Sequence, residues 1–247
     1  MNELLTIFKD TTVEIEWNRV LDSLKGAGIK VTLEVRDNPI TFVPPDQRID
    51  IAKEFASAKI VDGKRPVIDP FIGEVTFEMH RFSGRKILGI LYDAQIVRNI
   101  YYKILSKWMQ SNPLDEPYII ITDDLIGTLD DDGFYHGRTA LFSCPTLVSI
   151  SGFKYALARD KEYYLSKALK HRFRIPEAEP DEPVQISAQV LLSRYIIQAI
   201  FFFRTGYPFC EEKNCMLFNA HSVREIVQSQ VESDFLCRRH RNMLTYL

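Results

Sequence analysis

Short apolar segments and longer segments with helical spacing follow one another along most of this chain. Five segments are apolar and rich in β-branched residues, which predicts strands over residues 29–35, 87–91, 118–122, 139–143 and 147–150. Apolar residues that recur every three or four positions predict helices over residues 17–24, 48–59, 94–109 and 185–203. This alternation predicts strands and helices packed in layers.

Three further segments have less regular patterns. Residues 67–82 are mixed and predicted to be strand-rich, and residues 154–172 predict a charged helix. Residues 175–183 hold three prolines and four acidic residues, which predicts a solvated loop.

The fold class that follows is α/β (α+β), with a mixed β-sheet packed by helices. Tyr118–Thr122 is expected to be a central strand that runs into a polar loop. We expect an N-terminal α/β part over residues 1–184 and a C-terminal part over residues 185–247, the two forming one compact domain.

Composition and charge narrow the class of protein. The chain has 247 residues, of which 46% are hydrophobic and 26% charged, as in ordinary soluble globular proteins. A net charge of −2 gives no global preference for nucleic acid. No apolar run reaches the roughly 20 residues of a membrane-spanning helix, and the first residues lack the pattern of a signal peptide. We therefore expect a cytoplasmic protein without membrane contact.

Three of the four cysteines cluster near the C-terminus in a spacing typical of metal sites. Cys210-x4-Cys215 is followed by Cys237-x2-His240, which supplies three sulfurs and one imidazole in two pairs. This ligand set predicts one tetrahedral structural zinc that ties the C-terminal tail to the end of the long helix. His221 is the reserve fourth ligand, and unrelated buried thiols are the alternative.

The same region resembles the archaemetzincins, a family of zinc-dependent metallopeptidases. Their motif reads H-E-x-x-H-x-x-G-x-x-H-C-x4-C-x-M-x17-C-x-x-C, and alignment on Cys210 and Cys215 places its glycine on Gly206 without a gap. Cys237 follows after an interval two residues longer, and His240 replaces the last cysteine. The resemblance implies a metzincin-like fold with a C-terminal structural zinc subdomain, and an archaeal source.

The catalytic part of the motif is missing. Ala199, Phe203 and Phe209 stand at the three histidine positions, and Ile200 stands at the general-base glutamate. These side chains can neither bind a catalytic zinc nor take a proton from water. The resemblance therefore implies an inactive peptidase in which these vestigial positions form an apolar plug.

The function we expect is that of a binding or regulatory factor acting on a protein or an RNA–protein complex. Arg238, Arg239 and Arg241 form a compact basic cluster that could contact RNA, although a solvated face is the default interpretation. Whether the chain forms homo-oligomers is left open.

The alternative function is that of a divergent zinc-dependent metallopeptidase or metallohydrolase. One version uses Asp123 and Asp124, at the end of a predicted strand, together with His136. Cys144 could be a nucleophile near His136, but lone cysteines in apolar strands are mostly inert. The segment from Thr128 to Gly133 resembles the start of a calcium loop without its bidentate glutamate, and a solvated loop is the preferred interpretation.

Overall fold

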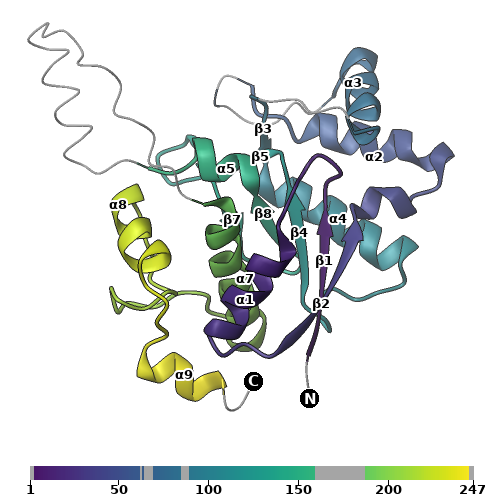
Figure 1. Ribbon diagram of the computed structural model, residues 1–247. Coiled ribbons are helices and arrows are strands. Elements are labelled where there is room, and N and C mark those ends of the chain that lie inside the picture. Colours follow the sequence, from purple (N-terminus) through teal and green to yellow (C-terminus); the bar gives the residue numbers. More distant parts are fainter. Residues whose placement is uncertain (1–2, 62, 64–68, 85–88, 159–186, 245–247) are drawn as a thin grey trace, which may run out of the picture.

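The computed structural model describes residues 3–61, 63, 69–84, 89–158 and 187–244 (Figure 1). Its larger sheet has the strand order β2-β1-β4-β8-β7. These strands are β1 (Glu3–Lys9), β2 (Val31–Asp37), β4 (Tyr118–Thr122), β7 (Ala140–Leu141) and β8 (Thr146–Ser149). The first four strands in this order are parallel, and β7 is an antiparallel edge. Tyr118–Thr122 is thus the central strand, as the sequence predicts.

A second, smaller sheet has the order β3-β5-β6, with β3 (Leu91–Asp93) parallel to β5 (Leu125–Leu129) and β6 (Tyr135–Arg138) antiparallel to β5. The turn between β5 and β6 contains the calcium-loop-like segment. There the Asp130 carboxylate binds the Arg138 guanidinium. This segment is therefore a hairpin turn, in line with the preferred interpretation.

Helices cover both faces of the larger sheet. The helical segments are α1 (Trp17–Gly26), η1 (Pro39–Phe42), η2 (Pro45–Gln47), α2 (Arg48–Ser57), α3 (Ile72–Phe82), α4 (Ala94–Trp108), α5 (Ile150–Tyr155), α7 (Ala188–Thr205), α8 (Val223–Ile226), η3 (Val227–Val231) and α9 (Arg238–Leu244). The two mixed sheets packed by helices confirm the predicted α/β fold class.

Alternate residues of the central strands enter two different hydrophobic cores. Ile119 and Ile121 pack in the core that includes α1 and α7, whereas Ile120 packs in the core that includes α2 and α4. Because successive side chains of a strand point to opposite faces, this division places helices on both sides of the sheet. Helix α7 is buried almost all around over Leu191–Phe201. It belongs to the core that also contains the C-terminal cysteines.

A buried arginine in the apolar helix α7 also ties the C-terminal region to the rest of the fold. The Arg194 guanidinium bonds the Ser23 hydroxyl of α1, the Gln230 carbonyl and the Asp234 carboxylate. Buried charges of this kind need several partners, and these partners come from α1 and from the C-terminal segment that contains Gln230 and Asp234. The C-terminal region is therefore attached by more than its cysteines.

One sequence prediction about an element was wrong, one strand was not predicted, and two further predictions lie largely outside the described residues. Residues 72–82 form helix α3, because Val75 and Glu78 lie one helical turn apart and face inward. Strand β1 was not predicted at all. The charged helix predicted over residues 154–172 and the loop predicted over 175–183 fall mostly within residues 159–186, which are not described.

Among the described residues, no helix is both long enough and apolar enough to cross a membrane.

Candidate functional site

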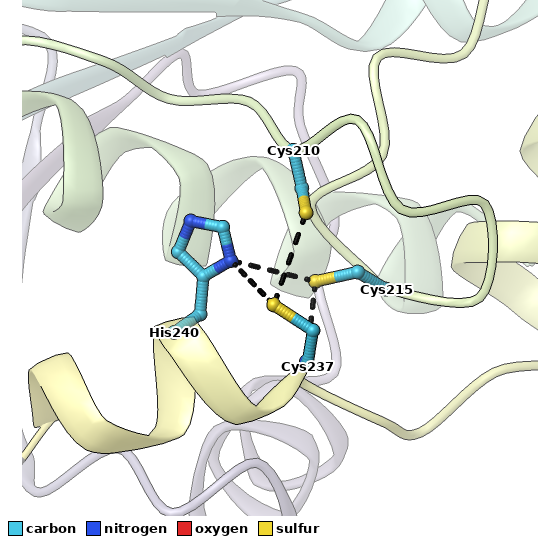
Figure 2. A group of neighbouring side chains, drawn as sticks. All are labelled: Cys210, Cys215, Cys237 and His240. Carbon is cyan, nitrogen blue, oxygen red and sulfur yellow. Dashed lines mark hydrogen bonds between the residues drawn. The ribbon is translucent and has the colours of Figure 1, made fainter.

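The four residues of the predicted metal site lie together and are buried. Figure 2 shows the four side chains pointing toward one another. Their ligand atoms all lie within 4.8 Å of one another. Cys210 Sγ is 3.9 Å from Cys237 Sγ, and His240 Nδ1 is 3.7 Å from Cys215 Sγ and 3.1 Å from Cys237 Sγ. A tetrahedral ion bound at about 2.0–2.3 Å would hold such ligands roughly 3.5–3.8 Å apart. The donor set therefore fits one metal ion.

Local backbone structure positions each pair of ligands. Helix α7 ends at Gly206, whose left-handed φ of 76° turns the chain toward Cys210. The Cys210 amide donates to the Leu217 carbonyl, which closes the loop that carries Cys215. Cys237 directly precedes α9, and His240 lies within its first turn, so both point to one side.

Two backbone amides donate to cysteine sulfurs. The Glu212 amide lies 3.4 Å from Cys210 Sγ, and the Cys237 amide lies 3.4 Å from Cys215 Sγ. Such donors favour the thiolate form that a metal requires.

Without an ion, burial works against the charged forms of these ligands. It raises the pKa of the Cys215 thiol to about 12 and raises the pKa of Cys210, while it lowers the pKa of His240. A cation bound between the sulfurs would supply the missing positive charge, and the neutral imidazole is already the form that binds metals. The cluster is therefore suited to a bound cation.

The cluster also links distant segments of the fold. The His240 ring packs edge-on against Phe201 of α7, with ring centroids 5.2 Å apart. His221, the reserve ligand, is exposed and is not among the four converging residues. All four positions around the cluster centre are filled by protein atoms, as in metal sites that stabilise a fold.

The four positions that align with the catalytic residues of the archaemetzincin motif lie in apolar surroundings. Ala199 and Ile200 are buried in the core, and Ala199 and Phe203 line a small cavity beside Cys144. Phe209 packs edge-on against Phe142, with ring centroids 5.4 Å apart.

The residues of the alternative hydrolytic site are only partly brought together. Asp123 and Asp124 follow β4 and line a cavity at the carboxyl ends of the strands, which we call the carboxyl-edge cavity. His136 lies outside this lining, on β6, where its Nε2 is 2.8 Å from Asp132 Oδ2. Cys144 lies elsewhere, and burial raises the pKa of its thiol, the opposite of what an activated nucleophile needs.

A buried ion network that the sequence did not reveal adjoins Asp124. The Arg81 guanidinium binds Asp124 and Glu78 at 2.6 Å each, and Lys59 Nζ lies 2.8 Å from Glu78. Burial raises the pKa of Asp124 to about 6 despite the opposing effect of Arg81. Perturbed acids in a cavity are typical of functional sites, although structural networks produce them too.

The residues most clearly missed from the sequence are Asp10 and Arg48, which also line the carboxyl-edge cavity. Asp10 directly follows β1, just as Asp123 directly follows β4. The sequence therefore has an apolar, β-branched run followed by an acidic residue at both places. Only the run before Asp123 led to the prediction of a strand with a candidate site at its end.

The predicted basic cluster lies on α9 beside the metal ligands. Arg238, Arg239 and Arg241 are exposed, and the Arg241 guanidinium lies 4.7 Å from the Phe235 ring centre. Across the described part of the chain, none of the three forms an ion pair. Whether this surface binds a partner stays a prediction.

Comparison with known proteins places this chain in a family. Residues 1–247 match the model of the family described as "Probable metallopeptidase family (DUF6775)", so the chain belongs to that family. No curated protein and no solved structure matches the chain. The family assignment agrees with a metallopeptidase relationship as the sequence predicts, at a coarser level than the archaemetzincins.

Proposed function

We propose that this chain is an inactive, archaemetzincin-like member of its family that binds a protein or an RNA–protein partner. The observation that carries this proposal is the character of the motif positions on and after α7. Alanine, isoleucine and two phenylalanines stand where a peptidase needs three imidazoles and a carboxylate. Their packing in apolar surroundings supports a role in stability.

We further propose that the Cys210, Cys215, Cys237 and His240 cluster holds one structural zinc. Three cysteine sulfurs and one imidazole nitrogen that lie within 4.8 Å of one another are the ligand set zinc favours. A bound zinc would supply folding free energy here, because the unfolded chain has no preformed site. We expect this protein to act in the cytoplasm, where such thiols stay reduced.

The proposed partner surface is the face of α9 that carries Arg238, Arg239 and Arg241. Three exposed guanidinium groups that form no ion pair with any described acidic residue favour contact with phosphate or carboxylate groups. RNA binding through this face would weaken steeply with salt, because counterions are released from the phosphates.

A divergent metallopeptidase is the second candidate, and the family assignment favours it. The metal-binding side chains of the described residues give this candidate little support. Within the described residues, the Cys3His cluster is the only group of three or more His, Cys, Asp or Glu side chains that converges closely enough for a metal.

The test is a peptidase assay on zinc-replete protein with fluorescently labelled casein as the substrate. We expect no cleavage above that of buffer, from protein whose circular dichroism and zinc content show it to be folded. Cleavage that a chelator abolishes and that zinc restores would overturn the proposal in favour of the second candidate.

The binding part of the proposal is tested by fluorescence anisotropy with single-stranded RNA at 50 and 200 mM salt. We expect binding that falls with salt and is lost in the triple variant Arg238→Ala, Arg239→Ala, Arg241→Ala, while Arg19→Ala, on an exposed ion pair of α1, is the matched control. Equal binding by the triple variant and the wild type would show that this face does not carry RNA.

A further inference from the structure

The carboxyl-edge cavity lies where ligands commonly bind in open α/β sheets. Asp10, Asn38 and Asp123 directly follow β1, β2 and β4, and all three line it. Strands β2 and β4 flank β1 on opposite sides, so the cavity lies at a topological switch point. It has an empty volume of about 630 Å³, open mouth included, and its lining includes Arg48 of α2 and Arg81 of α3. The carboxyl end of β1 lies at the end of the sheet opposite the N-terminus (Figure 1).

The Asp10 carboxylate is held in place by neutral groups. Its Oδ2 accepts from the Thr122 hydroxyl at 2.7 Å and from the Asp123 amide at 3.0 Å, and its Oδ1 accepts from the Asn38 side-chain amide. Asn38 is itself buried and also bonds the Tyr101 hydroxyl. Over the described ranges, no lysine, arginine or histidine forms an ion pair with Asp10. Its negative charge is oriented but not neutralised.

Arg48 lines the same cavity and is also held in place by neutral groups, but its charge is positive. Its Nε donates to the Val43 carbonyl at 2.9 Å, and its Nη2 donates to the Thr41 carbonyl at 3.0 Å. Both acceptors are neutral, and in the part of the chain that the structure describes no carboxylate forms an ion pair with this guanidinium. Two backbone contacts thus fix the planar group and leave its positive charge uncompensated.

Two other charged residues of the lining, Asp124 and Arg81, are different, because they belong to a network whose charges neutralise one another. Asp124, Arg81, Glu78 and Lys59 form the buried network, with two acids against two bases.

Asp123 also lines the cavity, and its Oδ1 accepts from the Ser151 hydroxyl at 3.3 Å. Asp10 and Arg48 are the acid and the base of the lining that neutral groups hold in place and that form no ion pair within the described residues.

We propose that the carboxyl-edge cavity binds a zwitterion that carries an ammonium and a carboxylate group, as free amino acids and short peptides do. The ammonium pairs with Asp10, and the carboxylate pairs with Arg48, whose fork suits a carboxylate. Amino acid and short peptide share this chemistry and differ in the span between their charged ends. The site takes no residue from α7, so it goes beyond the proposed function and holds whether or not the protein cleaves peptides.

The experiment is isothermal titration calorimetry of the zinc-loaded full chain with four probes. L-Alanine and L-alanyl-L-alanine are the zwitterions, alanine amide keeps only the ammonium, and N-acetylalanine keeps only the carboxylate. Because hydrogen bonds to charged groups are among the strong ones, we expect one or both zwitterions to bind about tenfold or more tightly than either single-charge probe. Tighter binding of L-alanine would identify a free amino acid as the ligand, and tighter binding of L-alanyl-L-alanine would identify a short peptide.

Variants assign each charged end to its residue. Arg48→Gln should lower the affinity for the zwitterion but leave the affinity for alanine amide unchanged. Asp10→Asn should likewise lower the affinity for the zwitterion but leave the affinity for N-acetylalanine unchanged. Asp37→Asn, an exposed acid at the end of β2 outside the cavity lining, is the matched control and should change nothing. This pattern across ligands would not arise from a residue with only a structural role.

Asp10→Asn is expected to destabilise the fold, because its new amide N–H would face groups that themselves donate to Asp10. Thr12→Leu keeps the network and adds bulk to the lining, so it should abolish binding of both zwitterions. Equal affinity of the wild type for all four probes, no binding of either zwitterion, or full binding by Thr12→Leu would each overturn the proposal.

Discussion

The two ends of the large sheet handle polar groups in opposite ways. The cysteine cluster packs three thiols and an imidazole into the core around α7, where burial disfavours their charged forms. The carboxyl-edge cavity leaves the Asp10 carboxylate and the Arg48 guanidinium only partly buried and fixes them with hydrogen bonds. The first arrangement is suited to a permanent ion, and the second is suited to a ligand that comes and goes.

This difference indicates which region of the molecule is the better candidate for activity. Two of the motif positions, Ala199 and Phe203, line a cavity of about 220 Å³, against about 630 Å³ at the carboxyl edge, open mouths included. The region that resembles a peptidase is thus the more filled one. The region with fixed, accessible charge lies at the other end of the sheet.

The largest expected effect is at the cysteine cluster. Cys215→Ser should lose the metal and lower the free energy of unfolding on the order of 4–5 kcal/mol, because it removes a ligand and leaves the other sulfurs without an ion. Cys144→Ser, the matched control, removes a cysteine outside the cluster and should keep both metal and stability to within about 1 kcal/mol. Urea unfolding with and without chelator measures both, and equal loss in the two variants would show that the cluster has no special role.

The next effect concerns the buried network behind the cavity. Arg81→Met should cost about 3–5 kcal/mol, because Glu78 and Asp124 would be left as buried acids without their shared cation. Lys103→Met breaks the exposed pair with Glu54 and should cost about 1 kcal/mol or less. Similar losses in urea unfolding of the two variants would contradict the burial that we assign to the network.

A smaller effect is expected at the apolar plug. Phe209→Ala should cost about 1–2 kcal/mol, less than the roughly 3–5 kcal/mol of a fully buried phenylalanine, because Phe209 is half-buried against Phe142. Phe134→Ala, on the exposed turn of the β5–β6 hairpin, is the control and should change stability by less than about 0.5 kcal/mol. If Phe209→Ala unfolds no more easily than its control, the vestigial position does not stabilise the fold.

The smallest effect is a pH dependence at the carboxyl edge. The folded-state pKa of Asp124, about 6, lies above the ordinary value of a carboxyl group, so its contribution to stability is complete at low pH and is lost as pH rises toward 6 and above. The wild type should therefore lose stability relative to Asp124→Asn between about pH 4 and about pH 6, by on the order of 1 kcal/mol. If instead the wild type gains stability relative to Asp124→Asn as the pH rises, the effect of Arg81 outweighs burial and lowers the pKa of Asp124.

The sequence predicted the elements whose patterns are local. The spacing of Trp17 to Leu24, the apolar run of Tyr118–Thr122 and the long helix before Cys210 all reappear in the structure. The cysteine and histidine pairs also come together as their spacing suggests, because each pair sits on a single turn.

The carboxyl-edge cavity could not be predicted in the same way, because its residues come from segments that only the sheet order brings together. Because β1 was not predicted, nothing in the sequence linked Asp10 to Asp123. Residues 67–82 were predicted to be strand-rich because Thr76 and Phe77 favour strands, so the sequence did not place Glu78 and Arg81 on one helix. In helix α3, Glu78 and Arg81 are one turn apart, which places both on the side that faces the buried network.

The most direct test of the central claim, that this chain keeps a structural zinc and no catalytic one, is elemental mass spectrometry on protein purified without added metal or a metal-affinity tag. We expect one zinc per chain in the wild type and in Cys144→Ser, and none in Cys215→Ser. Two metal ions per chain, or a zinc that remains in Cys215→Ser, would contradict the claim and restore the active metallopeptidase.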